Sequence, residues 1–354
     1  MFVLRCKDIK NLDFGQGFFV AKLCHKCYIA WEMGVDNEWE IFSHQRLVGN
    51  DYTVIKKIDS GTFCKAFLLT DKGGNYYVLR VSHSSIGDVD VANQWKQRQI
   101  KGYTLLSSRF GNYHGKLNLP QLITHGEGFI IEKYLGENIF GKNISVQEKQ
   151  KLARQLGEFL SCLHSKSPSQ EAKHEPHFIA YEQNLEYLQD ALSVEEKEAL
   201  ERKIAKYNSR DTSDEVTALV HHDLRSGNIL RNEKNGEFAL IDFEFLGEGC
   251  IYEDFAPRGA LAHYDNAFYD ILWNTIDEYN KTAVHKVNID KVKLFHELGI
   301  ISKYCEYADP LKREKVKVEI FKKLQQLNES FQAHENSRTS QMTDRNPKPE
   351  EKSV

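Results

Sequence analysis

The sequence predicts an α+β protein in which a β-rich part precedes a mainly helical part. From about residue 51 to residue 133, short runs of β-branched and aromatic residues alternate with turn residues, which is typical of strands. From residue 134 to residue 333, longer segments place apolar residues at helical spacing. Residues 1–50 precede both parts, and a polar segment, residues 334–354, follows them.

Length, charge and cysteine content narrow the class of protein. The 354 residues allow two lobes, and a hydrophobic content of 41% is ordinary for a globular protein. The net charge of −4 argues against a dedicated nucleic-acid binder, which would present a basic face. No apolar run reaches the about 18 residues of a membrane span, and Met1–Lys10 lacks a signal-peptide core. Because the 7 cysteines are odd in number and scattered, we expect no disulfide framework and a cytoplasmic location.

Residues 1–50 are predicted to form a β-rich extension. Phe18–Leu23 and Cys27–Trp31 are rich in aromatic and β-branched residues and are separated by a short polar turn, which indicates a hairpin. Cys24 and Cys27 have the spacing of zinc ligands, but no second Cys or His pair follows nearby. A turn that carries two free thiols is the favoured interpretation, and metal binding by this pair stays open.

The β-rich part, residues 51–133, contains two features that could bind phosphate. The loop Ser60-Gly61-Thr62 could fold over phosphates and offer backbone N–H groups, although its single glycine is equally compatible with an ordinary hairpin turn. Arg80 places a cation inside an apolar strand, and the alternative is an edge-strand arginine that faces water. The predicted strands are Tyr52–Ile58, Phe63–Thr70, Tyr76–Val81, Leu122–Thr124 and Phe129–Glu132, with a helix over Val91–Leu106.

The helical part, residues 134–333, follows a crossing at Lys133–Gly136. Two capping boxes, Ser145 with Glu148 and Ser193 with Glu196, predict the starts of two helices. Beyond about residue 333 the chain is polar and is predicted to be disordered. The further predicted helices are Asn266–Tyr279, Val292–Tyr307 and Leu311–Phe331.

The most informative stretch spans residues 219–244. His221-x-Asp223 is followed by Asn228, and a second apolar run ends on Asp242. A magnesium-dependent phosphoryl transferase needs one Asp to accept or orient the proton of the attacking hydroxyl, and an Asn and a second Asp to hold Mg²⁺. Mg²⁺ prefers hard oxygen ligands, which Asn and Asp supply. The alternative is two buried strands that end in solvated turns.

These motifs resemble those of the small-molecule kinases that include the aminoglycoside phosphotransferases and the choline, ethanolamine and thiamine kinases. His221-x-Asp223-x-x-x-x-Asn228 is similar to their catalytic loop, and Ile241–Glu244 is similar to their metal-binding segment. Glu253–Ala256 resembles the segment that opens their following helix. The resemblance implies a bilobal protein-kinase-like fold, with a small antiparallel sheet in the N-terminal lobe and a mainly helical C-terminal lobe. It covers about residues 52–281.

The resemblance also implies the role of each site residue. Asp223 would be the catalytic base or the group that orients the hydroxyl, and Asn228 and Asp242 would hold Mg²⁺. His221 would brace the loop, while Arg225 would touch the transferred phosphate or, alternatively, form a surface salt bridge. ATP would lie with its phosphates at the strand cation and the loop, and with its adenine at the crossing. The implied cofactor-binding residues are Ser60, Gly61, Thr62, Arg80, Glu132 and Tyr134.

One departure from the family pattern concerns the helix after Arg80. In the family this helix carries a Glu that pairs with the cation, whereas Asn93–Gln99 contains no Glu. Gln97 or Gln99 could stand in as a neutral hydrogen-bond partner. This departure, together with the thin glycine loop, favours one alternative to an active enzyme, namely a catalytically weak nucleotide-binding module.

The phosphate acceptor is predicted from charge. An acidic region after Asp242 suits an amine or quaternary ammonium group, and Tyr252, Tyr264 or Trp273 would supply an aromatic wall. The alternative is that Asp254 caps a helix and the glutamates are solvated. The acids in question are Glu244, Glu248, Glu253 and Asp254.

We therefore predict a phosphotransferase that uses ATP and Mg²⁺ and acts on a hydroxyl of a small molecule. An amine-bearing acceptor, similar to choline, ethanolamine or an aminoglycoside, is the narrower expectation. A protein kinase is the second hypothesis, but Ala256-Pro257-Arg258 lies too close to Asp242 for a usual activation segment. No nucleic-acid partner and no membrane span are expected, and the sequence defines neither the acceptor nor the oligomeric state.

Overall fold

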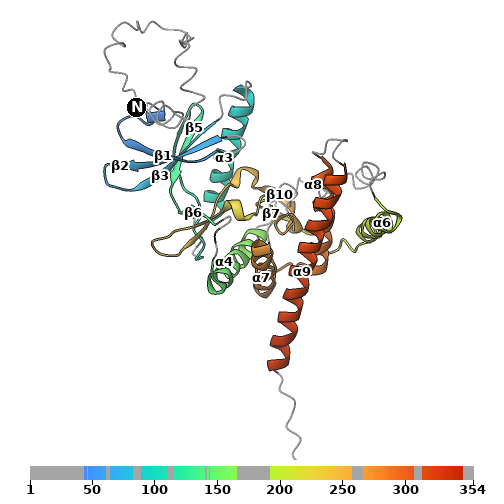
Figure 1. Cartoon of the computed structure of the whole chain (residues 1–354). Coiled ribbons are helices and arrows are strands. Elements are labelled where there is room, and N and C mark those ends of the chain that lie inside the picture. Colours follow the sequence, from blue (N-terminus) through green and yellow to red (C-terminus); the bar gives the residue numbers. More distant parts are fainter. Residues whose placement is uncertain are drawn as a thin grey trace, which may run out of the picture.

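The computed structural model of the chain has two lobes, a sheet lobe and a helical lobe, as Figure 1 shows. It describes residues 44–45, 47–60, 64–82, 89–110, 113, 115–139, 142, 144–165, 192–256, 266–306 and 313–345. The expected hairpin and the Cys24–Cys27 pair lie outside the described residues, as do Gly61 and Thr62. The structure confirms the predicted α+β fold with a small antiparallel sheet and a mainly helical second lobe.

The N-terminal lobe is a five-stranded antiparallel sheet with the order β1-β2-β3-β5-β4. Each predicted strand is present. Four are one or two residues longer than predicted, because ladder hydrogen bonds that the apolar pattern does not report hold their ends, and β2 has the predicted length but begins one residue later. The elements of this lobe are β1 (Tyr52–Ser60), β2 (Cys64–Asp71), β3 (Tyr76–Ser82), α3 (Val89–Phe110), β4 (Leu122–Gly126) and β5 (Phe129–Lys133).

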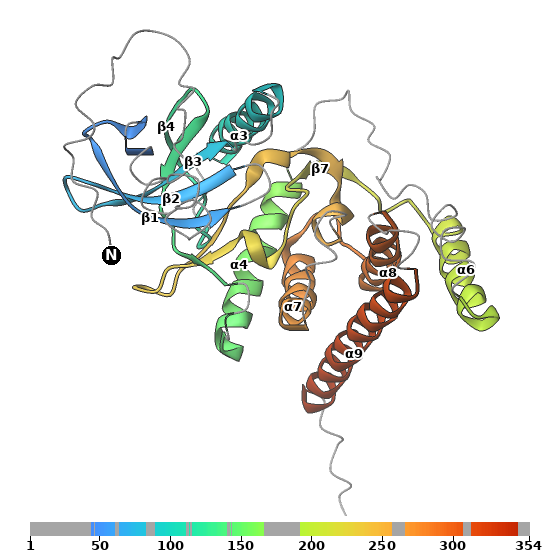
Figure 2. The same ribbon diagram turned by 45° about the horizontal axis from the view of Figure 1, so that its top comes forward.

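The two faces of this sheet have different coverings. Leu79 and Ile131 are buried together on one face. Helix α3 packs on the opposite face through Tyr103, and Figure 2 shows it lying along the sheet. Because side chains alternate along a strand, Arg80 and Glu132 must lie on the face that α3 covers. The arginine is therefore not a water-facing residue of an edge strand.

The C-terminal lobe is built on two long helices, α4 and α7, which lie side by side in Figures 1 and 2. Gly157 lets them approach closely, because a Cβ at this position would meet the backbone nitrogen of Tyr279 at 2.7 Å. Both predicted capping boxes are present, at Ser145 and Ser193. The helices of this lobe are α4 (Val146–His164), α6 (Val194–Asn208), α7 (Asn266–Thr282), α8 (Ile289–Glu306) and α9 (Arg313–Arg345).

Two small antiparallel sheets above these helices carry the loops of interest. One pairs β7 with β10, and the other has the order β6-β8-β9. Short 3₁₀ turns connect their strands. The strands are β6 (Glu137–Asn138), β7 (Thr217–Val220), β8 (Ile229–Arg231), β9 (Phe238–Leu240) and β10 (Gly247–Cys250), and the turns are η2 (Ser226–Asn228), η3 (Phe243–Phe245) and η4 (Ile251–Asp254).

The last helix differs from the prediction. Helix α9 continues to Arg345, whereas the sequence predicts a disordered chain from residue 334. Contacts to α7 explain the difference: His334 Nε2 lies 3.1 Å from Asp277 Oδ2, and Arg338 Nε lies 3.7 Å from Asp277 Oδ1. Arg338 also pairs with Glu335 within the helix, at 3.0 Å. A polar composition therefore does not exclude a helix here, because a neighbouring helix supplies the opposite charge.

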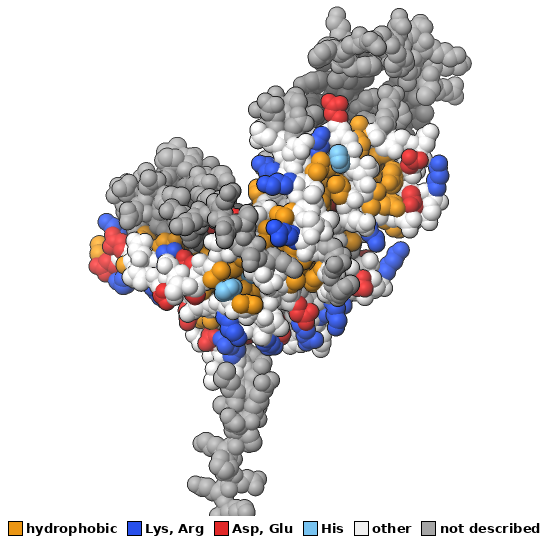
Figure 3. Space-filling model, turned by 180° about the vertical axis from the view of Figure 1, so that it is seen from behind, with side chains coloured by type: hydrophobic (Ala, Val, Ile, Leu, Met, Phe, Trp, Pro, Cys, Tyr) orange, Lys and Arg blue, Asp and Glu red, His pale blue; other side chains and the backbone are white. Residues whose placement is uncertain are grey.

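The distribution of charged side chains on the surface is consistent with the small net charge. In the view of Figure 3, Lys and Arg side chains are interspersed with Asp and Glu side chains over both lobes rather than gathered in one field. Within the described residues, no helix is both long enough and apolar enough to cross a membrane.

Candidate functional site

The loop between β7 and β8 is held at its start by a buried carboxylate. The backbone N–H groups of His221 and His222 donate to Asp254 Oδ2 and Oδ1, at 3.0 and 2.8 Å. His164 Nε2 lies 3.0 Å from the same Oδ2. Burial alone would raise the pKa of Asp254, but His164 and the backbone donors outweigh burial, so its pKa is lowered. Asp254 is thus an ionised anchor for the loop and not part of an acidic substrate surface.

His221 connects this loop to the segment before Asp242. The backbone N–H of Asp223 donates to His221 Nδ1 at 3.2 Å, so the ring donates from Nε2 to the carbonyl oxygen of Ile241 at 3.1 Å. The ring is fully buried and lies edge-on to Phe243, with centroids 4.6 Å apart. With both nitrogens occupied, His221 holds two functional segments together and has no nitrogen available for proton transfer.

Asp223 receives two donors from its own loop. Asn228 Nδ2 donates to Asp223 Oδ2 at 2.7 Å, and Arg225 Nε donates to the same oxygen at 3.1 Å. Burial raises the pKa of Asp223, while Arg225 lowers it and Asp242 raises it further. The net rise makes Asp223 a stronger base than an exposed aspartate. Arg225 therefore pairs with the mostly buried carboxylate of Asp223, and not with a surface acid as the alternative interpretation of the sequence had it.

Asn228 and Asp242 are brought together by the β8–β9 hairpin. Ile229 pairs with Leu240, and the backbone N–H of Ile241 donates to the carbonyl oxygen of Asn228 at 2.9 Å. Asn228 therefore lies beside the residue that precedes Asp242, at the same end of the hairpin. The sequence alone does not fix this register, but the register is what makes the two residues neighbours.

The two residues suit a hard cation that takes most of its ligands from elsewhere. Asn228 points its amide nitrogen at Asp223, so its carbonyl oxygen is the atom that could bind a cation. Among the described residues, no group of three or more His, Cys, Asp or Glu side chains could hold a metal ion. One carboxylate and one amide oxygen match Mg²⁺, which keeps several waters and phosphate oxygens in its shell, better than zinc or calcium.

Both functional loops contain a residue in left-handed backbone geometry. His222 has φ 67° and Asp242 has φ 68°, and neither is glycine. Such residues cost of order 1–3 kcal/mol each and persist where surrounding contacts hold them. His222 is held by Glu253, whose Oε2 lies 2.7 Å from His222 Nδ1. Gly249 makes room for this pair, since a Cβ there would meet the His222 ring at 2.5 Å.

Arg80 on β3 is paired with Glu132 on β5. Arg80 Nε donates to Glu132 Oε1 at 2.7 Å, and the Tyr103 hydroxyl from α3 donates to the other oxygen of Glu132. Burial opposes the charge of Arg80, but the Glu132 carboxylate outweighs burial, so the pKa of Arg80 is raised. Cys64 on β2 also contacts Arg80, and burial raises the pKa of this thiol to about 11, so it stays protonated.

Helix α3 contacts the segment that contains Asp242. Gln99 Nε2 donates to Asp242 Oδ1 at 2.7 Å. One turn later, a Cβ on Gly102 would lie 2.0 Å from the carbonyl oxygen of Phe243, so the helix backbone touches this segment directly. Arg98 lies 5.7 Å from the ring centroid of Phe245. Neither Gln97, which is exposed, nor Gln99 is the partner of Arg80 that the sequence suggested.

The remaining predicted cofactor residues are placed as follows. Ser60 ends β1, and the loop residues Gly61 and Thr62 lie outside the described part. Tyr134 is half-buried after β5, where its backbone N–H donates to the carbonyl oxygen of Tyr76 at 3.2 Å. The side chain of Glu132 is buried and faces Arg80. Sequence reasoning missed Tyr103, which no local motif distinguishes from a core tyrosine.

The expected aromatic wall is not formed by Tyr252 or Trp273. Both are fully buried, and Trp273 donates from Nε1 to Ser330 Oγ at 3.1 Å inside the helical core. Tyr264 lies outside the described residues. Glu244 is the acid that remains near the site: burial first, and Asp242 second, raise its pKa to about 7, and its Oε2 has no hydrogen-bond partner in the described part of the chain.

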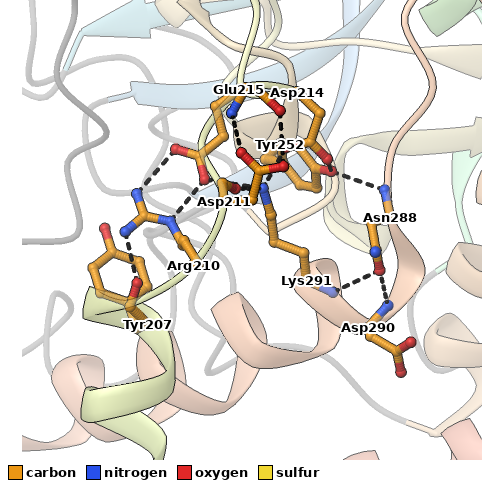
Figure 4. Close-up of polar contacts among 10 residues, drawn as sticks. Tyr207, Arg210, Asp211, Asp214, Glu215, Tyr252, Asn288, Asp290 and Lys291 are labelled. Carbon is orange, nitrogen blue, oxygen red and sulfur yellow. Dashed lines mark hydrogen bonds and ion pairs between the residues drawn. The ribbon is translucent and has the colours of Figure 1, made fainter.

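A charged network fixes Tyr252 below the loop (Figure 4). Arg210 donates to both oxygens of Glu215, at 2.7 and 2.9 Å. Lys291 contacts Asp214 and lies 3.3 Å from Glu215 Oε1 and 5.2 Å from the Tyr252 ring centroid. The Tyr252 hydroxyl donates to Asp214 at 2.5 Å. The network immobilises the residues just before Glu253 and Asp254, and its internal pairing explains why Tyr252 is not available to a substrate.

Comparison with known proteins gives a consistent picture of the fold. The model of the phosphotransferase enzyme family matches residues 54–286. The ADP-bound aminoglycoside phosphotransferase APH(2'')-Ib superposes with a TM-score of 0.53 at 21% identity, covering 82% of this chain and 98% of that chain. The macrolide 2'-phosphotransferase MphH from Brachybacterium faecium gives 0.53 at 15% identity, covering 80% and 98%.

A further solved structure is similar to the same extent. The streptomycin–ATP complex of APH(2")-IIa has a TM-score of 0.53 and 20% identity, and covers 82% of this chain and 97% of that chain. No curated protein sequence matches the chain. At these identities the solved structures share the fold with this chain, and their substrates do not carry over.

Proposed function

The chain belongs to the phosphotransferase enzyme family, and from that premise we propose that it transfers the γ-phosphate of ATP to a hydroxyl of a small molecule. One observation supports this most strongly. Asp223, Asn228 and Asp242 come from two loops but lie within hydrogen-bonding and electrostatic reach of one another. Two buried strands that simply end in solvated turns would not require these oxygen-bearing groups to converge.

Asp223 would act on the acceptor hydroxyl. It carries a raised pKa, which strengthens it as a base, and the donors from Asn228 and Arg225 fix the orientation of its carboxylate. Because phosphoryl transfer passes through a loose transition state, positioning the hydroxyl in line with the phosphate is a main task of this group. When the hydroxyl attacks phosphorus, its proton would pass to the carboxylate, and ADP would leave with the electron pair of the broken bond.

Groups from both lobes would neutralise the negative charge of the triphosphate. Arg80 offers the guanidinium nitrogens that Glu132 does not engage, and a guanidinium can bind phosphate oxygens bidentately. Asn228 and Asp242 would hold Mg²⁺, which neutralises the phosphate oxygens when it is bound. The loop at Ser60-Gly61-Thr62 would add backbone N–H groups.

An amine-bearing acceptor is the narrower form of this proposal. Glu244 lies two residues after Asp242 and has an oxygen without a partner in the described part of the chain. A protonated amine would supply that partner and would stabilise the ionised carboxylate, whose pKa is otherwise raised to about 7. A neutral acceptor would leave this oxygen unpaired.

The test is phosphoryl transfer from labelled ATP to a panel of amines, amino sugars, neutral sugars and peptides. Asp223→Asn should lower kcat by about 10²–10⁴ while nucleotide affinity stays within about threefold of wild type. Asp290→Asn makes the same chemical change at an exposed side chain that points away from its neighbours in Figure 4, and should leave kcat unchanged.

The possible outcomes separate the hypotheses. Labelling of amines but not of neutral sugars supports the narrower form, and labelling of peptides alone would replace it with a protein kinase. Nucleotide binding without transfer to any acceptor would identify a weak nucleotide-binding module instead.

A further inference from the structure

We propose that Glu132 and Gln99 have separate tasks: one positions the phosphate-binding group and the other positions a metal-binding group. In this proposal, which rests on the proposed function, Glu132 of β5 positions Arg80, and Gln99 of α3 positions Asp242. A residue of the sheet would therefore position Arg80, and a residue of helix α3 would position Asp242. Both are positioning residues, because each would act through another side chain.

The geometry of the sheet makes Glu132 the partner of Arg80. Arg80 pairs with Ile130 across β3 and β5, so Glu132 is the diagonal neighbour on the same face, within reach of a long side chain. The Arg80–Glu132 contact is 2.7 Å, and the two side chains are only 13% and 4% exposed. Tyr103 donates to the second carboxylate oxygen, so rotation of Glu132 would break two contacts at once.

From Val91 onward, helix α3 carries no carboxylate that could take this place. No acidic residue occurs from Val91 to Phe110. Gln97 is exposed, and Gln99 is buried against Asp242. The charged partner of Arg80 thus lies on β5, and not at the helix position where this family is expected to carry it.

The neutrality of Gln99 has a physical reason. Its Nε2 donates to Asp242 at 2.7 Å, and a carboxylate at the same position would place two negative oxygens in contact. The helix cannot move away to relieve such a contact without losing its own packing, because its backbone lies directly against Phe243 at Gly102. An amide satisfies both conditions, since it donates to Asp242 and adds no charge.

The division predicts different binding defects for the two residues. Glu132→Gln should weaken nucleotide binding about tenfold, both with and without Mg²⁺, because Arg80 loses a charged partner. Gln99→Met should leave binding in EDTA unchanged and raise the Mg²⁺ concentration for half-maximal nucleotide binding by about tenfold, because only the metal ligand loses its support. Calorimetric titration with a non-hydrolysable ATP analogue measures both quantities without turnover.

A swap of the two side chains gives the sharpest test. The double variant Glu132→Gln/Gln99→Glu moves the carboxylate from the sheet to the helix. We expect it to recover none of the nucleotide affinity lost in Glu132→Gln. Gln97→Glu, which adds the same charge to an exposed position of the same helix, is the matched control and should bind like wild type.

Two outcomes would overturn the proposal. Recovery of affinity in the swapped variant would mean that position 99 can serve Arg80, and wild-type binding by Glu132→Gln would mean that Glu132 does not position it. Should Glu132→Gln fail to fold in a thermal scan, Tyr103→Phe removes one hydrogen bond to the same carboxylate, and should weaken binding about threefold with or without Mg²⁺. Unaltered binding by Tyr103→Phe would then count against the proposal.

The experiment also separates this inference from the proposed function. If wild type binds the ATP analogue but transfers phosphate to no acceptor, the proposed function fails while the two binding defects can still be measured. If wild type binds no nucleotide under any condition, both proposals are wrong.

Discussion

At the scale of single residues, three donors converge on the fully buried carboxylate of Asp254. They are two consecutive backbone N–H groups at the start of the loop that carries Asp223, and His164 Nε2 from the end of α4. His164 in turn contacts the Tyr279 hydroxyl through Nδ1 at 3.0 Å. The position of the loop therefore depends on one anion in the helical core.

Replacing this anion tests that dependence. Asp254→Asn should lower the free energy of unfolding by roughly 2–5 kcal/mol, because the single oxygen of the amide cannot accept from all three donors that the carboxylate satisfies. It should also lower kcat, measured well below the unfolding temperature, because Asp223 loses its fixed position. Urea unfolding and steady-state kinetics check the two effects.

A surface aspartate provides the control for this substitution. Asp270 forms an exposed ion pair with Lys149 at 2.8 Å. Asp270→Asn should change the free energy of unfolding by less than about 1 kcal/mol, because exposed ion pairs contribute little. Equal losses of unfolding free energy in the two variants would show that Asp254 does not anchor the loop.

At the scale of elements, the contact between α3 and η3 depends on the absence of a side chain. In an exposed helix, replacing glycine by alanine is stabilising by up to about 1 kcal/mol. At Gly102 the added Cβ would lie 2.0 Å from the carbonyl oxygen of Phe243 and 2.8 Å from its carbonyl carbon. Both are backbone atoms that cannot rotate away, so the helix or the metal-binding segment has to shift.

Gly102→Ala should therefore destabilise the protein by about 1–3 kcal/mol and also reduce activity. The activity loss is expected as an increased requirement for Mg²⁺, since the shifted segment contains Asp242. Gly157→Ala is the matched control, because its Cβ would meet α7 backbone at 2.7 Å, and the three atoms nearest to it all belong to α7 and not to the segment that contains Asp242. It should cost similar stability without changing the Mg²⁺ requirement, and a changed requirement in both variants would contradict this assignment.

The elements also show what sequence reasoning can and cannot supply. Strands and capped helices follow from local patterns, and the spacing from Asp223 to Asn228 is short enough to fix their proximity. The Arg80–Glu132 pair depends on strand register across 52 residues, and the Gln99–Asp242 bond on helix docking across 143 residues. No local pattern encodes either contact, so the sequence suggested Gln97 or Gln99 as the partner of Arg80, whereas the structure shows Glu132 of the sheet.

At the scale of the whole molecule, pH should change stability through a histidine in the core. His296 is fully buried, and its Nε2 contacts the carbonyl oxygen of Phe255 at 2.6 Å. Burial lowers its pKa from 6.5 to about 4, although the contact with Phe255 opposes this shift. The folded state therefore keeps His296 neutral at pH values where the unfolded chain binds a proton.

The sign of the effect follows from this difference. Above pH 6.5 both states are neutral and His296 adds no pH dependence, whereas below it the unfolded state gains a proton that the folded state does not. The free energy of unfolding should fall by up to about 1.4 kcal/mol per pH unit between pH 6.5 and 4 from this residue. Urea titrations at several pH values measure the slope, and His296→Gln, which does not titrate, should flatten it. Equal slopes of unfolding free energy against pH for wild type and His296→Gln would contradict the prediction.

The direct contact of α3 with the metal-binding segment also limits how the two lobes can separate. The helix is part of the N-terminal lobe, yet its Gly102 backbone touches Phe243 in the C-terminal lobe and its Gln99 is bonded to Asp242. A rotation that keeps this contact must have its axis close to Gly102, because atoms near an axis move least. We expect nucleotide exchange to proceed on the side of the lobe boundary farthest from α3, and a covalent cross-link near Gly102 should slow it less than one placed on that opposite side.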